Sequence, residues 1–257
     1  MVSAAASPAL ENRLQSCSSW PERFTREQWA IYKSVMAAAR EHGIPFAIGG
    51  ALSAMTYAGS WRDTKDIDLY ILKRDRGQLI RVLADLGLQD YYEQLPYDRN
   101  WIYRSYKNGI IVDIMWAMAN QRAAVTETWL RGPEIEVDGV RFRLLPPEEA
   151  IWSKLYVMQR DRCDWPDIFN IVRGLSGDLD WQRLMSKLNG DVRLFGGVLS
   201  AYGWLCPDEA RKIPASVWEQ AGISVPAEQG GTEMTAERSR LLDSRPWLGV
   251  PAGERRG

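Results

Sequence analysis

Residues 46–72 constrain the fold more than any other part of the chain, because they combine a Gly-Gly turn with a closely spaced pair of carboxylates. The pattern predicts a short apolar strand, a turn at Gly49-Gly50, a helix, a polar loop and a second strand that starts at Asp66. Strand side chains alternate between faces, so Asp66 and Asp68 point the same way. Two carboxylates on one face need water, a cation or hydrogen bonds to be stable there. A divalent metal beside an anion-binding turn would meet that need, and it indicates phosphoryl or nucleotidyl transfer.

A third carboxylate, Asp113, interrupts the apolar run of residues 110–116. The preceding run ends at Asn108-Gly109, a strong signal for a hairpin, so Asp113 falls in the middle of a predicted strand. An isolated carboxylate is unfavourable in that position. If this strand lies beside the one with the first two carboxylates, all three converge, and two metal ions about 3.5–4 Å apart fit among them. The alternative for Asp113 is a buried carboxylate paired with an Arg or Lys, and the alternative for the first two is a solvated acidic pair.

Several residues near these carboxylates are candidates for binding phosphate. Gly49 and Gly50 would let the backbone approach an anion at the start of the helix, with Ser53 assisting from the first helical turn. The alternative is an ordinary tight turn. The loop before the acidic strand supplies further candidates, which are either phosphate-binding or solvated. They are Arg62, Thr64 and Lys65.

Together, these motifs resemble the DNA-polymerase-beta-like nucleotidyltransferase superfamily. The resemblance covers residues 45–116 and continues to about residue 174, where the pattern is similar to minimal nucleotidyltransferases that include abortive-infection and toxin–antitoxin toxins. Many members carry Gly-Ser at the turn, whereas this chain has Gly49-Gly50-Ala51, a form found in the minimal subgroup; Ser53 would then supply the hydroxyl. The resemblance implies an α+β fold, with a mixed sheet flanked by helices and followed by a helical C-terminal part.

The resemblance also implies a role for each carboxylate. Asp66 and Asp68 would bind one or two Mg²⁺ ions, with Mn²⁺ as an alternative, and Asp113 would bind the catalytic metal and position or deprotonate the acceptor hydroxyl. Lys154, on the first helix after the predicted hairpins, would reach the triphosphate. Asp164 and Asp167 fall where the family often places a further acidic motif, but a helix N-cap explains Asp164 better.

The expected activity is Mg²⁺-dependent transfer of a nucleoside monophosphate from a nucleoside triphosphate to an acceptor hydroxyl, with release of pyrophosphate. The acceptor is left open among tRNA, a protein side chain and a small molecule such as an antibiotic, and so is an antitoxin partner. The alternative is a catalytically inactive protein that keeps the nucleotidyltransferase fold for binding. The intact set of three carboxylates argues against that alternative.

Composition excludes several other classes of protein. The chain has 257 residues, of which 46% are hydrophobic and 25% charged, as is typical of soluble globular proteins. A net charge of −1 gives no general basic field for nucleic acid, which argues mildly against a tRNA acceptor. Three widely separated cysteines indicate neither a zinc site nor a disulfide framework and suit a reducing cytoplasm. The sequence lacks a secretory leader and an apolar run long enough to span a membrane. Its single histidine, His42, is expected to cap a helix C-terminus, which argues against a Ser-His-Asp triad and a multi-His metal site.

The distribution of residues along the chain predicts four parts. Their boundaries follow from the loss of apolar periodicity at both ends and from a change to helical patterns after Pro146-Pro147. The parts are a flexible N-terminal arm (1–24), an α/β catalytic domain (25–145), a helical C-terminal domain (146–221) and a mobile or disordered tail (222–257).

Overall fold

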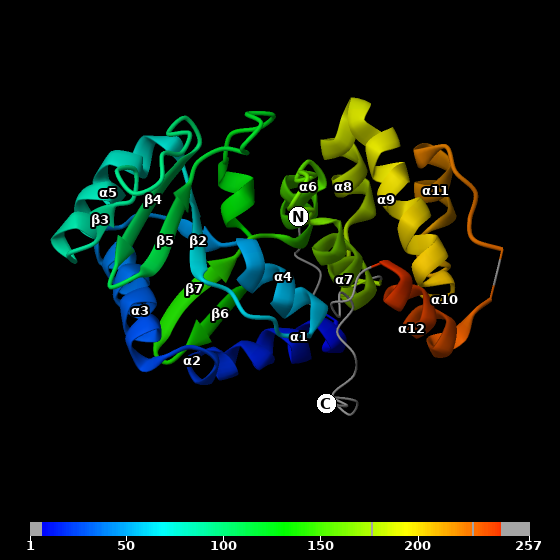
Figure 1. The fold of residues 1–257 in the computed structure, drawn as a ribbon, viewed down its shortest axis with the longest axis horizontal. Helices are drawn as coiled ribbons and strands as arrows, with labels where there is room; N and C mark the ends of the chain where they lie inside the picture. Colours follow the sequence, from blue (N-terminus) through cyan, green and yellow to red (C-terminus); the bar gives the residue numbers. More distant parts are fainter. Residues whose placement is uncertain (1–6, 176, 228, 243–257) are drawn as a thin grey trace.

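The computed structural model describes residues 7–175, 177–227 and 229–242, which Figure 1 shows as a sheet with a group of helices beside it. Within these residues, seven strands form one mixed sheet in the order β3-β4-β5-β2-β1-β7-β6. Helices α6 to α12 gather beside the sheet, on the right in Figure 1. The predicted α+β fold class is therefore confirmed. The strands are β1 (Phe46–Ile48), β2 (Asp66–Ile71), β3 (Gln89–Asp90), β4 (Ile102–Lys107), β5 (Ile110–Met115), β6 (Glu134–Val137) and β7 (Val140–Leu144).

The centre of the sheet places the two acidic strands next to each other. Strand β2 pairs with β1 in antiparallel and with β5 in parallel orientation, and β5 continues into β4 through the predicted hairpin at Asn108-Gly109. On β2, Ile67 and Leu69 are fully buried, which leaves the acidic residues to share the opposite face. The second predicted hairpin forms β6 and β7, with Asp138 and Gly139 at positive φ in its turn.

Helix α3 (Arg26–Glu41) begins and ends at the signals that the sequence contains. The Oγ1 atom of Thr25 accepts a hydrogen bond from the N–H of Gln28 at 3.1 Å, as expected of an N-cap, and Gly43 follows the helix with a φ of +67°. Among the residues that the structure describes, every helix is too short or too polar to span a lipid bilayer. The other α-helices are α1 (Pro8–Gln15), α2 (Trp20–Arg23), α4 (Gly50–Ala58), α5 (Arg76–Asp85), α6 (Pro147–Leu155), α7 (Trp165–Leu175), α8 (Trp181–Leu188), α9 (Val192–Leu205), α10 (Pro207–Ala210), α11 (Ala215–Ala221) and α12 (Gly231–Leu242). Short 3-10 helices cover Ser16–Ser19, Lys73–Asp75, Glu127–Leu130 and Asn189–Asp191.

Helix α4 joins the sheet to the helices that follow it. It contacts β2, α6 and α7, and Figure 1 shows it between the sheet and the helical group. The Tyr57 hydroxyl donates a hydrogen bond to the Leu145 carbonyl oxygen at 2.7 Å. A Cβ at Gly174 would lie 2.1 Å from the Tyr57 carbonyl oxygen, so α7 approaches α4 too closely for a side chain there. The domain boundary expected after residue 145 stays a prediction.

Residues 8–23 differ from the flexible arm that the sequence predicted, because they form α1, a 3-10 helix and α2. Two buried side chains anchor this segment to the core, and the half-buried Leu10 and Leu14 pack against it as well. Cys17 is 1% exposed, with its Sγ atom 3.4 Å from Oγ1 of Thr56, and Trp20 packs against Phe142 with ring centroids 5.6 Å apart. Leu10, Leu14 and Cys17 lie at helical spacing, so the sequence contains a short helical signal among small and polar residues that the prediction of a flexible arm did not use.

The C-terminal end also differs in part from the predicted tail. Within residues 222–257, α12 forms a helix whose residues are exposed or half-buried. Residues 243–257 lie outside the described residues, as do residues 1–6 of the predicted arm.

Candidate active site

The three predicted carboxylates meet at the centre of the sheet. Asp68 on β2 lies directly beside Asp113 on β5 in the parallel register, and Asp66 lies two residues earlier on the same face of β2. One oxygen from each carboxylate lies within 4.8 Å of the other two. Because side chains of one face are brought together by strand pairing, this cluster follows from the fold and does not depend on a loop conformation.

The cluster has more negative charge than its surroundings favour. Asp113 is 1% exposed, while Asp66 and Asp68 are half-buried. Burial, Asp66 and Asp113 together raise the pKa of Asp68 to about 8. Burial also raises the pKa of Asp113. Three carboxylate oxygens at this separation are a suitable donor set for a hard divalent cation, which would relieve the repulsion among them.

Arg104 contacts the most buried of the three carboxylates. It lies opposite Asp113 in the β4–β5 hairpin, its Nε–H is 2.9 Å from Oδ1, and its Nη2–H is 2.5 Å from Oδ2. Two features that the sequence presented as alternatives therefore occur together. Asp113 is paired with a cation, and it also belongs to the three-carboxylate cluster. Arg104 is absent from the residues predicted from sequence. Its signal was available in the hairpin register, since a turn at Asn108-Gly109 places residue 104 opposite residue 113.

The Gly-Gly turn brings the start of α4 against the acidic strand. The N–H of Gly49 donates to the Asp68 carbonyl oxygen at 2.9 Å, and Gly50 has a φ of +58°. A Cβ at Gly50 would lie 1.5 Å from Oδ2 of Asp68, and a Cβ at Gly49 would lie 2.2 Å from the Tyr70 ring. The first N–H groups of a helix have no acceptor within the helix. The turn therefore sets a potential anion site beside the potential metal site.

Other predicted phosphate-binding residues have varied surroundings. Ser53 is fully buried, and its hydroxyl donates to the Gly50 carbonyl oxygen at 3.4 Å within the first turn of α4. The Thr64 hydroxyl donates to Oδ1 of Asp66 at 2.9 Å, which fixes that carboxylate. Lys65 is exposed. The roles predicted for these residues stay predictions.

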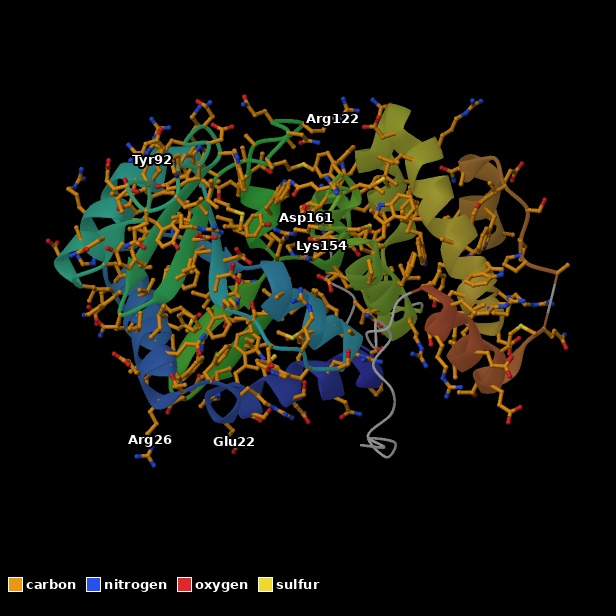
Figure 2. All side chains as sticks on the ribbon, viewed as in Figure 1. Glu22, Arg26, Tyr92, Arg122, Lys154 and Asp161 are labelled. Carbon is orange, nitrogen blue, oxygen red and sulfur yellow. The ribbon has the colours of Figure 1, made fainter. Side chains whose placement is uncertain are left out.

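Lys154 is buried between two carboxylates. Its Nζ atom lies 3.1 Å from Oδ2 of Asp164 and 2.7 Å from Oδ2 of Asp167, and its side chain is only 7% exposed. Arg162 also pairs with Asp164, and Arg62 pairs with Asp167 at 3.1 Å. In Figure 2 Lys154 lies in the middle of the molecule, between the sheet and the helices beyond it. A triphosphate that reaches Lys154 would therefore compete with two carboxylates already bound to it.

Comparison with known proteins gives one match over most of the chain. The sequence model of a family described as uncharacterised nucleotidyltransferase matches residues 2–190. A search of curated proteins found no match.

Solved structures of low sequence identity also match. The antibiotic-resistance factor ANT(2'')-Ia is 19% identical with a TM-score of 0.48, and the match covers 68% of this chain and 96% of that one. The lincosamide antibiotic adenylyltransferase LnuA is 13% identical with a TM-score of 0.41, covering 58% of this chain and 95% of that one. The Megavirus polyadenylate synthase is 14% identical with a TM-score of 0.41, covering 76% of this chain and 45% of that one.

Proposed function

The chain belongs to the family of uncharacterised nucleotidyltransferases, and from that premise we propose that Asp66, Asp68 and Asp113 form its divalent-metal site. The enzyme would move a nucleoside monophosphate from a nucleoside triphosphate to an acceptor hydroxyl. One observation carries the proposal: three carboxylate oxygens lie within 4.8 Å of one another, beside a turn that has no room for a side chain at Gly50.

In the proposed reaction, the acceptor oxygen attacks the α-phosphorus of the triphosphate in line with the leaving group. The bond from the α-phosphorus to the bridging oxygen breaks, pyrophosphate leaves, and the acceptor proton passes to Asp113 or to water. Mg²⁺, or Mn²⁺ in its place, would supply charge neutralisation and a lowered pKa of the acceptor hydroxyl. Asp66 and Asp68 would hold the ion, Asp113 would orient the acceptor, and the N–H groups at the start of α4 would bind the leaving phosphates.

Further nucleotide contacts are proposed for residues around the cluster. Thr64 would keep the Asp66 carboxylate in one orientation through its 2.9 Å hydrogen bond. Lys65 is exposed and unconstrained enough to follow a phosphate, whereas Lys154 and Arg62 would have to share their charge with Asp167. Ser53 would orient the first turn of α4 through its hydrogen bond to the Gly50 carbonyl oxygen. Where a second metal ion binds, Asp66 and Asp68 would hold it together with the first.

The direct test is transfer of label from α-labelled ATP, GTP, CTP and UTP to pools of tRNA, protein and hydroxyl-bearing small molecules such as aminoglycosides. We expect label in one pool, at least about 100-fold less of it with Asp68→Asn, and wild-type levels with Asp63→Asn, an exposed carboxylate of the preceding loop. Asn at position 68 removes repulsion from two neighbouring carboxylates, so the variant should melt no lower than the wild type. Equal labelling by the wild type and Asp68→Asn would overturn the metal assignment.

The acceptor determines the biological class. Label in tRNA alone would support a toxin-type enzyme and would justify a search for an antitoxin partner. A net charge of −1 favours a small molecule or protein over tRNA. Free thiols at the three cysteines support a cytoplasmic site of action.

A second candidate is a binding protein that keeps the fold without catalysis. The pairing of Arg104 with Asp113 favours it, because the guanidinium occupies part of the carboxylate that would hold metal. Calorimetry with Mg²⁺ and each nucleoside triphosphate measures binding, and together with the transfer assay it separates the two candidates. Binding of nucleotide without any transfer to the three acceptor pools would support the second candidate.

A further inference from the structure

Arg104 provides the triad of Asp66, Asp68 and Asp113 with a cation of its own. The guanidinium uses two N–H groups on the two oxygens of Asp113, with Nε at 2.9 Å from Oδ1 and Nη2 at 2.5 Å from Oδ2. The Arg104 side chain is 28% exposed and that of Asp113 is 2% exposed, so the pair is largely removed from solvent. A two-pronged pair of this kind fixes the orientation of the carboxylate as well as its charge.

The position of Arg104 is set by the sheet. Asp68, Asp113 and Arg104 are direct neighbours across β2, β5 and β4. Arginine keeps its charge at every physiological pH, so this positive charge is permanent. Two further cations near the triad, Lys154 and Arg162, both pair with Asp164.

A resident cation at Asp113 has two consequences for a divalent ion. A carboxylate has about four lone-pair positions, and Arg104 occupies at least two of those on Asp113. Asp113 therefore keeps at most about two free lone-pair positions for a metal, one on each oxygen. The positive charge of Arg104 also repels a second cation that approaches the same carboxylate.

We propose that Arg104 sets the divalent-metal affinity of the Asp66–Asp68–Asp113 triad by competing with metal for Asp113. In this assignment Arg104 is a positioning residue that keeps Asp113 oriented and keeps metal binding weak when no nucleotide is present. The proposal rests on the metal site described under Proposed function. It differs from a purely structural role, in which Arg104 would stabilise the hairpin without changing metal affinity.

The test measures Mn²⁺ binding to the full chain without nucleotide, by calorimetry, for variants that separate charge from shape. Arg104→Gln removes the charge but keeps an N–H donor, and Arg104→Lys keeps the charge but removes the fork. We expect Arg104→Gln to bind Mn²⁺ at least about tenfold more tightly than the wild type, a difference of about 1.4 kcal/mol, and Arg104→Lys to stay within about threefold of the wild type. Arg74→Gln removes the same charge from an exposed pair with Glu127 and should leave the affinity unchanged.

The melting temperature provides a second measurement in case Arg104→Gln folds poorly without metal. Arg104→Gln leaves a buried carboxylate without its cation, so Mn²⁺ should raise its melting temperature more than it raises that of the wild type. In Arg104→Gln combined with Asp113→Asn, the extra metal-induced shift should disappear.

Two failures can be told apart. If the wild type and Arg104→Gln bind Mn²⁺ equally, or if Arg104→Gln binds it more weakly, Arg104 does not compete with metal for Asp113. The metal site itself would still stand. If neither protein binds Mn²⁺ with or without a nucleoside triphosphate, the proposed metal site fails and the role of Arg104 fails with it.

Discussion

At the scale of single residues, Gly50 makes the approach of α4 to the acidic strand sterically possible. A Cβ there would lie 1.5 Å from Oδ2 of Asp68, and the φ of +58° is one that side-chain-bearing residues adopt at a cost. The same residue is thus required for two independent reasons. Gly43 also has a positive φ, at +67°, but a Cβ at Gly43 would have nothing within 4 Å. Gly43 therefore shows the cost of the backbone strain without the clash.

We therefore expect Gly50→Ala to lower the free energy of unfolding by more than about 2 kcal/mol, because strain at positive φ adds to a clash with Asp68. Gly43→Ala should cost only about 1 kcal/mol, the strain alone. Urea denaturation of both variants measures the difference. Equal losses would show that the space beside Asp68 is not tight.

The residue scale also shows what sequence alone can supply. The pairing of Asp66 with Asp68 on one face follows from strand periodicity, and the place of Asp113 follows from a turn signal. The contact between β2 and β5 depends on a parallel pairing between distant segments, which no local pattern specifies. The two carboxylates that pair with Lys154 are a nonlocal contact of the same kind, because they depend on where α6 and α7 meet.

At the scale of secondary-structure elements, a short hairpin separates α6 from α7. Apolar residues at helical spacing continue to Met158, but α6 ends at Leu155, and the Asp164 N–H donates to the Val157 carbonyl oxygen at 2.9 Å. This reversal brings Asp164 back to Lys154. Hydrogen bonds across the hairpin replace those of a continued helix, and the buried ion pairs that result are nonlocal, so periodicity alone could not predict them.

Lys154→Met tests the contribution of this ion-pair cluster. Removal of one partner from a buried pair costs about 3–5 kcal/mol, and Arg162 and Arg62 remain on Asp164 and Asp167, so we expect a loss of about 3 kcal/mol at pH 7. Burial favours a higher pKa for Asp167, but Lys154 and Arg62 outweigh it and leave that pKa below its ordinary value. A carboxylate with a lowered folded pKa stabilises the protein above its unfolded pKa, near 3.9, and loses that contribution as the pH falls. The difference in the free energy of unfolding between wild type and Lys154→Met should therefore shrink as the pH falls below about 3.9.

Denaturant melts between pH 3 and pH 7 measure this pH dependence. Lys212→Met is the control, because its pair with Glu209 is exposed and contributes about 0.5 kcal/mol or less. A wild-type-like stability of Lys154→Met across the whole range would contradict the account.

At the scale of the whole molecule, α4 couples the sheet to the helices. It begins at the acidic site, contacts β2, and packs closely on α7 at Gly174. The Tyr57 hydroxyl adds a buried hydrogen bond to the chain that leads into α6. The sequence predicted a division at residue 145, yet it could not show that α4, the helix after the Gly-Gly turn, contacts both sides of that division. Packing of this kind depends on the tertiary fold.

Because α4 belongs to both parts, we expect the protein to unfold in one cooperative transition. Differential scanning calorimetry should give a single peak, and melts followed by helical circular dichroism and by tryptophan fluorescence should coincide. Two separated transitions would show that the predicted domains are energetically independent.

The most direct measurement of the central claim is anomalous diffraction from crystals soaked with Mn²⁺ and a nucleoside triphosphate analogue that has a methylene group between the α- and β-phosphorus atoms. The account predicts a metal peak about 2 Å from carboxylate oxygens of Asp66 and Asp68, with the analogue's phosphates at the start of α4. Bound analogue without any metal peak at these carboxylates would contradict it.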